Sequence, residues 1–269
     1  MLADKLFPTS VAQVYDTHLV PLIFEPYAED LVQRLAGKPY TRVLEVAAGT
    51  GAVTRKLARV LPRSATIVAT DLNQGMLDVA EAVGTSRTVE WRLADAMQLP
   101  FPDREFDAVV CQFGTMFFPD KVKAFAEARR VLRPGGTFVF SVWDRIEENH
   151  FAATVTGALA TVFPDDPPRF LARVPYAYWD RAAIAGDVAR SGFAVPPEIQ
   201  TVSARGRAAS PRIPAVAFCQ GTPLRGEIEA RDAARLEEAT HRAEAAVAQR
   251  FGRGAVEGAL QAHIVTIEA

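Results

Sequence analysis

The chain has 269 residues, 49% of them hydrophobic, so it can bury a sizeable core as one large domain or as a domain with a small cap. Its formal net charge of −2 excludes the strongly basic surface of a nucleic-acid-binding protein or a polybasic membrane patch. No uncharged run reaches the roughly 18 residues of a membrane span, no signal-peptide pattern opens the chain, and we expect a cytoplasmic protein with two reduced, buried cysteines.

The N-terminal segment precedes the first predicted strand, so it is not needed to complete a sheet. Its apolar residues have a helical spacing that Pro21 interrupts, and aromatic residues are frequent in it. We therefore predict a helical lid over residues 1–40, hinged at this proline. Tyr15 and His18 are its candidate polar groups for contact with a bound molecule.

Residues 42–143 alternate between two kinds of pattern. Short runs rich in β-branched or aromatic residues predict strands at 42–47, 66–71, 89–95, 106–111 and 137–143. Helical patterns lie between them at 51–61, 73–83 and 119–132. Strands separated by helices require a mostly parallel sheet covered on both faces, so we predict a doubly wound, Rossmann-like α/β fold.

A glycine loop, residues 45–51, joins the first predicted strand to the first helix. Gly49 and Gly51 permit a tight turn there, and the helix N-terminus offers N–H groups to a polar ligand. A dinucleotide-binding loop would have a third glycine where this chain has Thr54. The loop departs from the dinucleotide pattern, but on its own it is a weak signal and does not separate NAD from other adenosine ligands.

Two acids end the next two predicted strands. Asp71 lies where a carboxylate can accept hydrogen bonds from both ribose hydroxyls. Asp95, followed by Ala96, lies where a carboxylate and a backbone N–H can recognise adenine. Because the carboxyl ends of parallel strands meet at one edge, these residues are expected to converge on one crevice.

With these residues in this order, together with "FDAVVCQFGTMFF" and "RVLRPGGTFVFSVW", residues 40–143 resemble the class I S-adenosylmethionine-dependent methyltransferases. The resemblance is greatest to the branch that contains small-molecule methyltransferases and the ubiquinone/menaquinone-biosynthesis C-methyltransferases. It implies S-adenosylmethionine as cofactor and seven strands, with the last strand antiparallel. The residues that it implies for cofactor binding are Glu45, Ala47, Ala48, Gly49, Gly51, Asp71, Leu72, Met76, Asp95, Ala96, Gln112 and Phe113.

The resemblance also implies a role for each group of residues. Glu45 would orient the glycine loop, whose backbone would lie against the methionine part of the cofactor. Leu72 and Met76 would line the adenosine, and Gln112 with Phe113 would pass under the sulfonium side.

Ala47 is a departure, because the family commonly has glycine at this position. An added methyl group matters if the backbone needs a positive φ or if the ligand touches Cα. We predict that the strand holds Ala47 at negative φ and that Gly49 and Gly51 make the close approach.

Beyond residue 143 the resemblance is looser. The patterns predict a helix at 178–193, a strand at 197–205 and a last, antiparallel strand at 260–269. Residues 206–258 then form an insertion with a helix over 231–252, and the stretch 218–220 either enters the substrate pocket or belongs to a plain packing appendage. The predicted domains are the lid 1–40, the cofactor-binding core 41–145, and residues 146–269, which complete the sheet and carry lid and helical insertions.

The function expected from these features is methyl transfer to a small-molecule acceptor. A sulfonium methyl is already electrophilic, so the protein mainly aligns the acceptor and excludes water. His18 and His150 are candidate bases, but neither lies in a specific catalytic pattern, and the spacing of histidines and cysteines predicts no metal site. The alternatives are a non-catalytic protein that binds S-adenosylmethionine or S-adenosylhomocysteine and a nicotinamide-dependent oxidoreductase; the acceptor, the attacked atom and the oligomeric state stay open.

Overall fold

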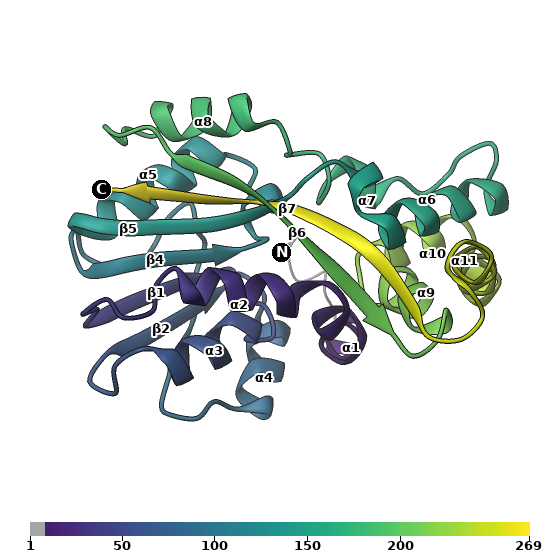
Figure 1. The fold of residues 1–269 in the computed structure, drawn as a ribbon, viewed down its shortest axis with the longest axis horizontal. Helices are drawn as coiled ribbons and strands as arrows, with labels where there is room; N and C mark the ends of the chain where they lie inside the picture. The colour runs from purple at the N-terminus through teal and green to yellow at the C-terminus, as the bar shows by residue number, and fades with distance from the viewer. Residues whose placement is uncertain (1–8) are drawn as a thin grey trace. The chain divides into compact units, whose positions relative to one another are not determined.

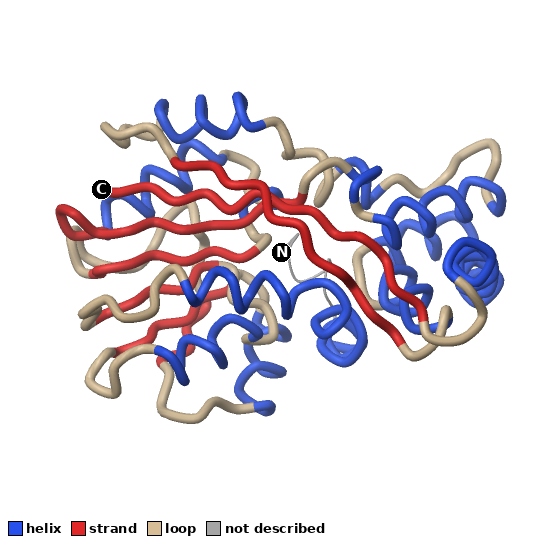
Figure 2. The backbone as a smooth tube through the Cα atoms, viewed as in Figure 1, coloured by secondary structure: helices blue, strands red, loops and turns tan. Residues whose placement is uncertain are grey.

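A computed structural model describes residues 9–269 and contains a seven-stranded sheet with the strand order β3-β2-β1-β4-β5-β7-β6 (Figures 1 and 2). The strands are β1 Arg42–Val46, β2 Thr66–Asp71, β3 Glu90–Leu93, β4 Phe106–Gln112, β5 Leu132–Trp143, β6 Glu198–Ala208 and β7 Val256–Glu268. The strands β1 to β5 pair in parallel, and β7 pairs antiparallel with β5. The predicted fold and the antiparallel last strand are confirmed.

The chain divides into two compact units. The sheet unit comprises Tyr27–Trp143, Tyr178–Val202 and Ala262–Ala269. The helical unit comprises the described residues up to Pro26, Asp144–Ala177 and Ser203–Gln261. The predicted N-terminal lid is thus divided between the two units at residue 26.

The sheet unit has helices on both faces of its strands. They are α2 Glu25–Gln33, α3 Ala52–Val60, α4 Gln74–Val83, η3 Thr115–Phe117, α5 Lys121–Val131 and α8 Arg181–Arg190. In Figure 1, α2 and α3 lie in front of the sheet and α5 lies behind it, where α5 packs on β5 and α8. The central strands β1 and β4 are mostly apolar and buried, as strands covered on both faces require.

The helical unit is built from three separate stretches of chain. Its elements are α1 Thr9–Val14, η2 Tyr15–Phe24, η4 Ile146–Glu148, α6 His150–Val162, α7 Phe170–Arg173, α9 Arg212–Gln220, α10 Leu224–Asp232, η5 Ala233–Arg235 and α11 Leu236–Phe251. Within it, α11 packs against α6 and α9, and α9 packs against η2. The single helix predicted over 231–252 is interrupted at its start, because the side chain of Asp232 accepts a hydrogen bond from the N–H of Ala234 and begins a short 3₁₀ turn.

The predicted interruption at Pro21 is wrong. Pro21 lies inside η2, a π-helix that continues directly into α2. A π-helix has a wider turn than an α-helix, and we attribute the continuity of the helix through a residue without an N–H group to this wider register.

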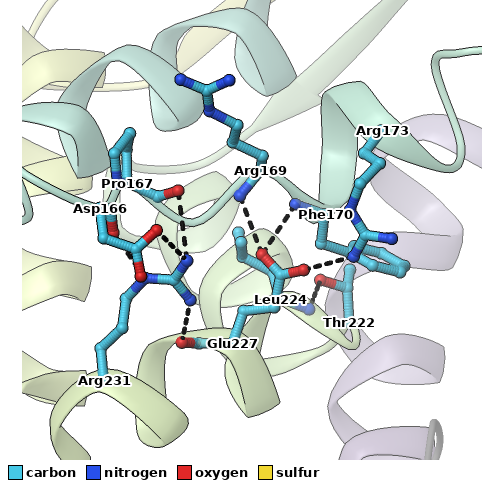
Figure 3. A network of polar contacts seen from close by, with 9 residues as sticks. All are labelled: Asp166, Pro167, Arg169, Phe170, Arg173, Thr222, Leu224, Glu227 and Arg231. Atoms are coloured by element: carbon cyan, nitrogen blue, oxygen red, sulfur yellow. Dashed lines mark hydrogen bonds and ion pairs between the residues drawn. The ribbon is translucent and has the colours of Figure 1, made fainter.

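Polar contacts fix the short helix α7 to α10 within the helical unit (Figure 3). One carboxylate oxygen of Glu227 accepts hydrogen bonds from the N–H groups of Arg169 at 2.8 Å and Phe170 at 3.0 Å, and the other pairs with Arg173 at 2.6 Å. Arg231 donates to the carbonyl oxygen of Asp166 at 2.6 Å. The carboxylate of Glu227 therefore serves as the N-terminal cap that α7 lacks in its own sequence.

In the sheet unit, the carboxylate of Asp107 on β4 joins the starts of β1 and β5. It accepts hydrogen bonds from the N–H and hydroxyl groups of Thr41 at 2.6 and 2.7 Å and from the N–H of Arg42 at 2.9 Å, and it pairs with Arg133. Partial burial alone would raise the pKa of Asp107, but these donors lower it from 3.8 to about 2.

Replacing Asp107 with Asn should therefore lower the free energy of unfolding by about 1–2 kcal/mol at neutral pH, the usual effect of losing charge-assisted hydrogen bonds. Because the folded-state pKa is below the ordinary value, the stabilisation is complete above about pH 4 and is lost as the pH falls through about 2. Urea unfolding of the parent and the variant at several pH values measures this difference. Asp103→Asn is the control, since Asp103 is exposed and pairs with Arg130 alone, and should change stability by less than about 0.5 kcal/mol. An Asp107 variant as stable as the parent at neutral pH would contradict this interpretation.

Candidate functional site

The glycine loop between β1 and α3 rests on a buried carboxyl group. Glu45 is 1% exposed, and one of its oxygens accepts a hydrogen bond from the hydroxyl of Thr54 at 2.5 Å. Burial raises the pKa of Glu45 to about 8, against the hydrogen bond from Thr54 and the charge of Arg55, which lower it. The threonine that replaces the third glycine of a dinucleotide loop therefore has a specific role, since it holds Glu45 beneath the loop.

Asp71, at the end of β2, fixes the loop from the side. One of its oxygens accepts the N–H of Gly49 at 2.8 Å, and the other accepts the N–H of Asn73 at 2.9 Å. Burial raises the pKa of Asp71, while the N–H groups of Asn73, Gly49 and Leu72 lower it. Each carboxylate oxygen keeps a further lone pair, so Asp71 can still accept hydrogen bonds from a ligand.

The N–H groups of the loop are largely used within the protein. Besides the bond from Gly49 to Asp71, Ala48 donates to the carbonyl of Thr70 at 2.9 Å and Gly51 donates to the carbonyl of Ala48 at 3.0 Å. A phosphate-binding loop needs such N–H groups free and pointing at the ligand. The sequence-based expectation that this helix N-terminus offers them to a ligand therefore fails for these three residues.

The two glycines of the loop have different surroundings. Both have positive φ, 56° at Gly49 and 82° at Gly51. A Cβ added to Gly51 would lie 3.1 Å from Trp91, whereas one added to Gly49 would have nothing within 4 Å. Gly51 is thus needed for packing, and Gly49 borders open space in which a ligand group can lie.

The prediction for Ala47 is wrong, because its φ is 55°. The left-handed conformation is unfavourable for a residue with a Cβ. It is accommodated here because the methyl group points to the turn after β4, where the facing residue is Gly114. The residue that indicates the positive φ of Ala47 is Gly114, which lies in the turn after β4 and not in the glycine loop.

The residues after β2 and β3 lie near one another at the same edge of the sheet. Asp71 pairs with Leu93 across the two strands, and the carbonyl of Asp71 accepts the N–H of Ala94 at 2.9 Å. Leu72 is 49% exposed. The side chain of Asn73 caps α4 through the N–H of Met76, which is buried.

Asp95 and Ala96 form a short turn that follows β3. One carboxylate oxygen of Asp95 accepts the N–H of Met97 at 2.8 Å, and its carbonyl accepts the N–H of Gln98 at 3.0 Å. Ala96 is buried. The turn is thus held by the carboxylate and the carbonyl of Asp95, and recognition of adenine by Asp95 and Ala96 stays a prediction.

Phe113, directly after β4, has a φ of 52° and is locked from several sides. Its N–H donates to the carbonyl and hydroxyl oxygens of Ser141, each at 3.1 Å. Its ring stacks on Trp143 with centroids 3.8 Å apart, and the edge of Tyr27 meets both rings at 5.4 Å. Tyr27 belongs to α2, so this helix packs on the core of the sheet unit through Phe113 and Trp143.

Three buried polar atoms near the ends of β1 and β4 have no hydrogen-bond partner within the described chain. They are the hydroxyl oxygens of Thr50 and Thr115 and the amide oxygen Oε1 of Gln112. Unpaired buried polar groups are costly, and in native proteins each calls for an explanation such as a functional role, a bound water or an ion. Thr50 and Thr115 were missed by sequence reasoning, because a threonine in a loop carries no signal until its burial is known.

The remaining candidates belong to the helical unit, and their predicted roles stay predictions. Tyr15 packs its ring on Phe24, and His150 stacks on Phe251 at 6.0 Å. Burial, and then the charges of Arg250 and Arg205, lower the pKa of His150. In the stretch 218–220, the first two residues are buried and the amide of Gln220 donates to Thr240 at 3.1 Å.

Within residues 9–269, no group of three or more histidine, cysteine or acidic residues could hold a metal ion. Over the same residues, no helix has the length and apolar character needed to cross a membrane. Cys111, on β4, is buried, and burial raises its pKa to about 12, so its thiol is inert as a nucleophile.

Comparisons with known proteins agree with this geometry. A family model described as a methyltransferase domain matches residues 44–140. An uncharacterised protein of Mycobacterium tuberculosis is 36% identical over 163 residues, which cover 60% of this chain and 56% of that protein. A ubiquinone/menaquinone biosynthesis C-methyltransferase of Teredinibacter turnerae is 31% identical over 170 residues, which cover 58% of this chain and 68% of that enzyme. The chain thus spans little more than half the length of the mycobacterial relative that it matches.

Solved structures share the fold at lower identity. The phosphoethanolamine N-methyltransferase 2 of Haemonchus contortus, in complex with S-adenosylhomocysteine, has a TM-score of 0.56 at 16% identity, covering 90% of this chain and 52% of that one. The YcgJ protein of Bacillus subtilis has a TM-score of 0.56 at 18% identity, covering 90% of this chain and 98% of that one.

The fold, the loop with its two supporting acids and the identity to the Teredinibacter enzyme lead to one conclusion: the chain belongs to the class I S-adenosylmethionine-dependent methyltransferases and is related to the ubiquinone/menaquinone biosynthesis C-methyltransferases.

Proposed function

We propose that this protein transfers a methyl group from S-adenosylmethionine to a small-molecule acceptor. The observation that carries the proposal is the glycine loop held by Asp71 through the N–H of Gly49, with open space beside Gly49. The cofactor-binding residues are those that the resemblance implies, from Glu45 to Phe113, joined by Thr50 and Thr115.

The residues present fit this cofactor. The carboxylate of Asp71 can accept the ribose hydroxyls, and the exposed Leu72 can cover one face of the adenine. The unpaired Oε1 of Gln112 can accept a hydrogen bond from the ammonium of the methionine part. When bound, S-adenosylmethionine supplies an electrophilic methyl group, and the protein's own contribution is to hold the acceptor in line with it and to exclude water.

The acceptor is proposed to be a small molecule because relatives with the fold act on small molecules by name. One is a ubiquinone/menaquinone biosynthesis C-methyltransferase, and another is a phosphoethanolamine N-methyltransferase. In this proposal, residues 41–145 form the cofactor-binding core, while the N-terminal segment and residues 146–269 supply the surfaces that select the acceptor. The base that removes a proton from the acceptor, if one is needed, is unassigned.

The first test is ligand binding followed by turnover. Calorimetric titration should show S-adenosylhomocysteine binding with a Kd in about the micromolar range and no binding of NADH. Incubation with methyl-labelled S-adenosylmethionine and a library of phenols, enols, quinols and amines should then label at least one acceptor. NADH binding without a response to S-adenosylhomocysteine would overturn the proposal, and cofactor binding with no labelled acceptor would favour the non-catalytic alternative.

A second prediction concerns Asp71. Asp71→Ala should weaken S-adenosylhomocysteine binding by about 1.5–3 kcal/mol, because it removes the proposed ribose acceptor and releases the N–H of Gly49. The variant should also unfold at a lower temperature, so affinity is measured well below its Tm. Asp78→Ala on the exposed side of α4 is the control and should bind as the parent does. Parent-like affinity of the Asp71 variant would remove this residue from the site.

A third prediction uses the unpaired buried atoms. Gln112→Leu and Thr115→Val each remove a polar atom that has no partner in the free protein, so the Tm of the free protein should stay the same or rise. Affinity for S-adenosylhomocysteine should nevertheless fall, by about 1–2 kcal/mol for the glutamine variant. Differential scanning fluorimetry with and without the ligand measures both effects. A glutamine variant with full affinity would show that Oε1 does not meet the ligand.

A further inference from the structure

We infer that Gly114 is a positioning residue for the cofactor site and that Ala47 and Gly114 act as a steric pair which sets the spacing between the glycine loop and the turn after β4. The inference rests on the proposed function, because the ligand that would bind between the glycine loop and the turn after β4 is S-adenosylmethionine. It assigns a role to a residue outside the set that the sequence patterns indicate.

The conformation of Gly114 does not explain why it is a glycine. Its φ is −97° and its ψ is −34°, values that any residue adopts without strain. A Cβ added there would lie 2.5 Å from the Cβ of Ala47 and 2.8 Å from Sγ of Cys111. Non-bonded carbon atoms normally stay about 3.5–4.0 Å apart, so the position demands glycine for space alone.

The two clashes differ in kind. Sγ of Cys111 lies on a rotatable side chain, although the N–H groups of Gly114 and Thr115 donate hydrogen bonds to it, whereas the methyl group of Ala47 moves only with its backbone. This backbone is itself unusual, since Ala47 has a φ of 55°. Ala47 is therefore the nearer and the less adaptable obstacle to a side chain at 114, and the space that its methyl group needs is provided by Gly114.

The pair lies where the two neighbouring strands end. Glu45 of β1 pairs with Val110 of β4, so the loop after β1 and the turn after β4 leave the sheet side by side. The turn is rigid on its far side, because Phe113 is held by Ser141 and stacked on Trp143. A methyl group added at 114 would therefore displace the glycine loop rather than the turn.

The spacing matters because polar atoms without partners lie on both sides of it. Thr50 is in the glycine loop, and Gln112 and Thr115 flank the turn. A ligand that pairs with atoms on both sides needs the loop and the turn at a fixed separation. The Ala47–Gly114 contact supplies that separation, with the methyl group of Ala47 facing Gly114.

The test is a double-mutant cycle on the full chain. Gly114→Ala should lower the Tm and weaken S-adenosylhomocysteine binding at least about 30-fold, roughly 2 kcal/mol. Adding Ala47→Gly should restore most of both, because it removes the fixed methyl group and its strained φ. Gly186→Ala is the matched control, since a Cβ there meets only the flexible end of Arg190, and it should leave affinity unchanged.

Three results would overturn the inference. They are a Gly114→Ala variant with parent-like affinity, one that loses stability but keeps affinity, and a double variant no better than the single one. If Gly114→Ala fails to fold, the double variant decides, since a folded and binding double variant supports the pair and an unfolded one overturns it. The recovery of Tm is measured without ligand, so it tests the contact even if the parent does not bind S-adenosylhomocysteine, a result that would count against the proposed function instead.

Discussion

The hydrogen bond from the N–H of Gly49 to the carboxylate of Asp71 is the constraint on which the site depends. It joins the loop after β1 to the end of β2, and it uses a group that a phosphate-binding loop would present to its ligand. Because Ala48 and Gly51 also donate within the protein, the loop is shaped by internal hydrogen bonds before any ligand arrives. Such a loop can contact a ligand along its open side, but it has few free N–H groups to donate to an anion.

The acidic residues near the loop also disfavour an anionic ligand. Glu45 lies beneath the loop and Asp71 beside it, and the negative charge of Asp71 adds to the burial that raises the pKa of Glu45. A pyrophosphate placed here would meet carboxyl groups and few free N–H donors. A ligand with an ammonium and a sulfonium group would instead favour the ionised forms of these two carboxyl groups and lower their pKa values. The geometry thus separates a methyl donor from a nicotinamide dinucleotide more clearly than the missing third glycine does.

The sequence predicted the sheet well because β1, β2, β4 and β5 are local runs of mostly apolar residues. The failures all depend on contacts that the local pattern does not contain. The room for the methyl group of Ala47 at its positive φ is provided by Gly114, and the helix continues through Pro21 in a π-helical register. The unpaired hydroxyls of Thr50 and Thr115 become visible only when burial is known.

Two of the three non-glycine residues with positive φ among residues 9–269 lie at the same place as these unpaired atoms, and the third, Arg104, lies elsewhere. Ala47 and Phe113 both have positive φ, and they directly follow two neighbouring strands. Such conformations persist only where the surroundings over-determine them, and here the surroundings are Gly114 on one side and the Ser141 and Trp143 contacts on the other. Other unpaired buried atoms lie elsewhere in the described chain, on Arg42, Arg87, Glu105 and Thr156, but only here do three of them lie beside two residues with positive φ. Their coincidence at the carboxyl edge of the sheet is the pattern expected where a site is organised for a ligand at some expense of stability.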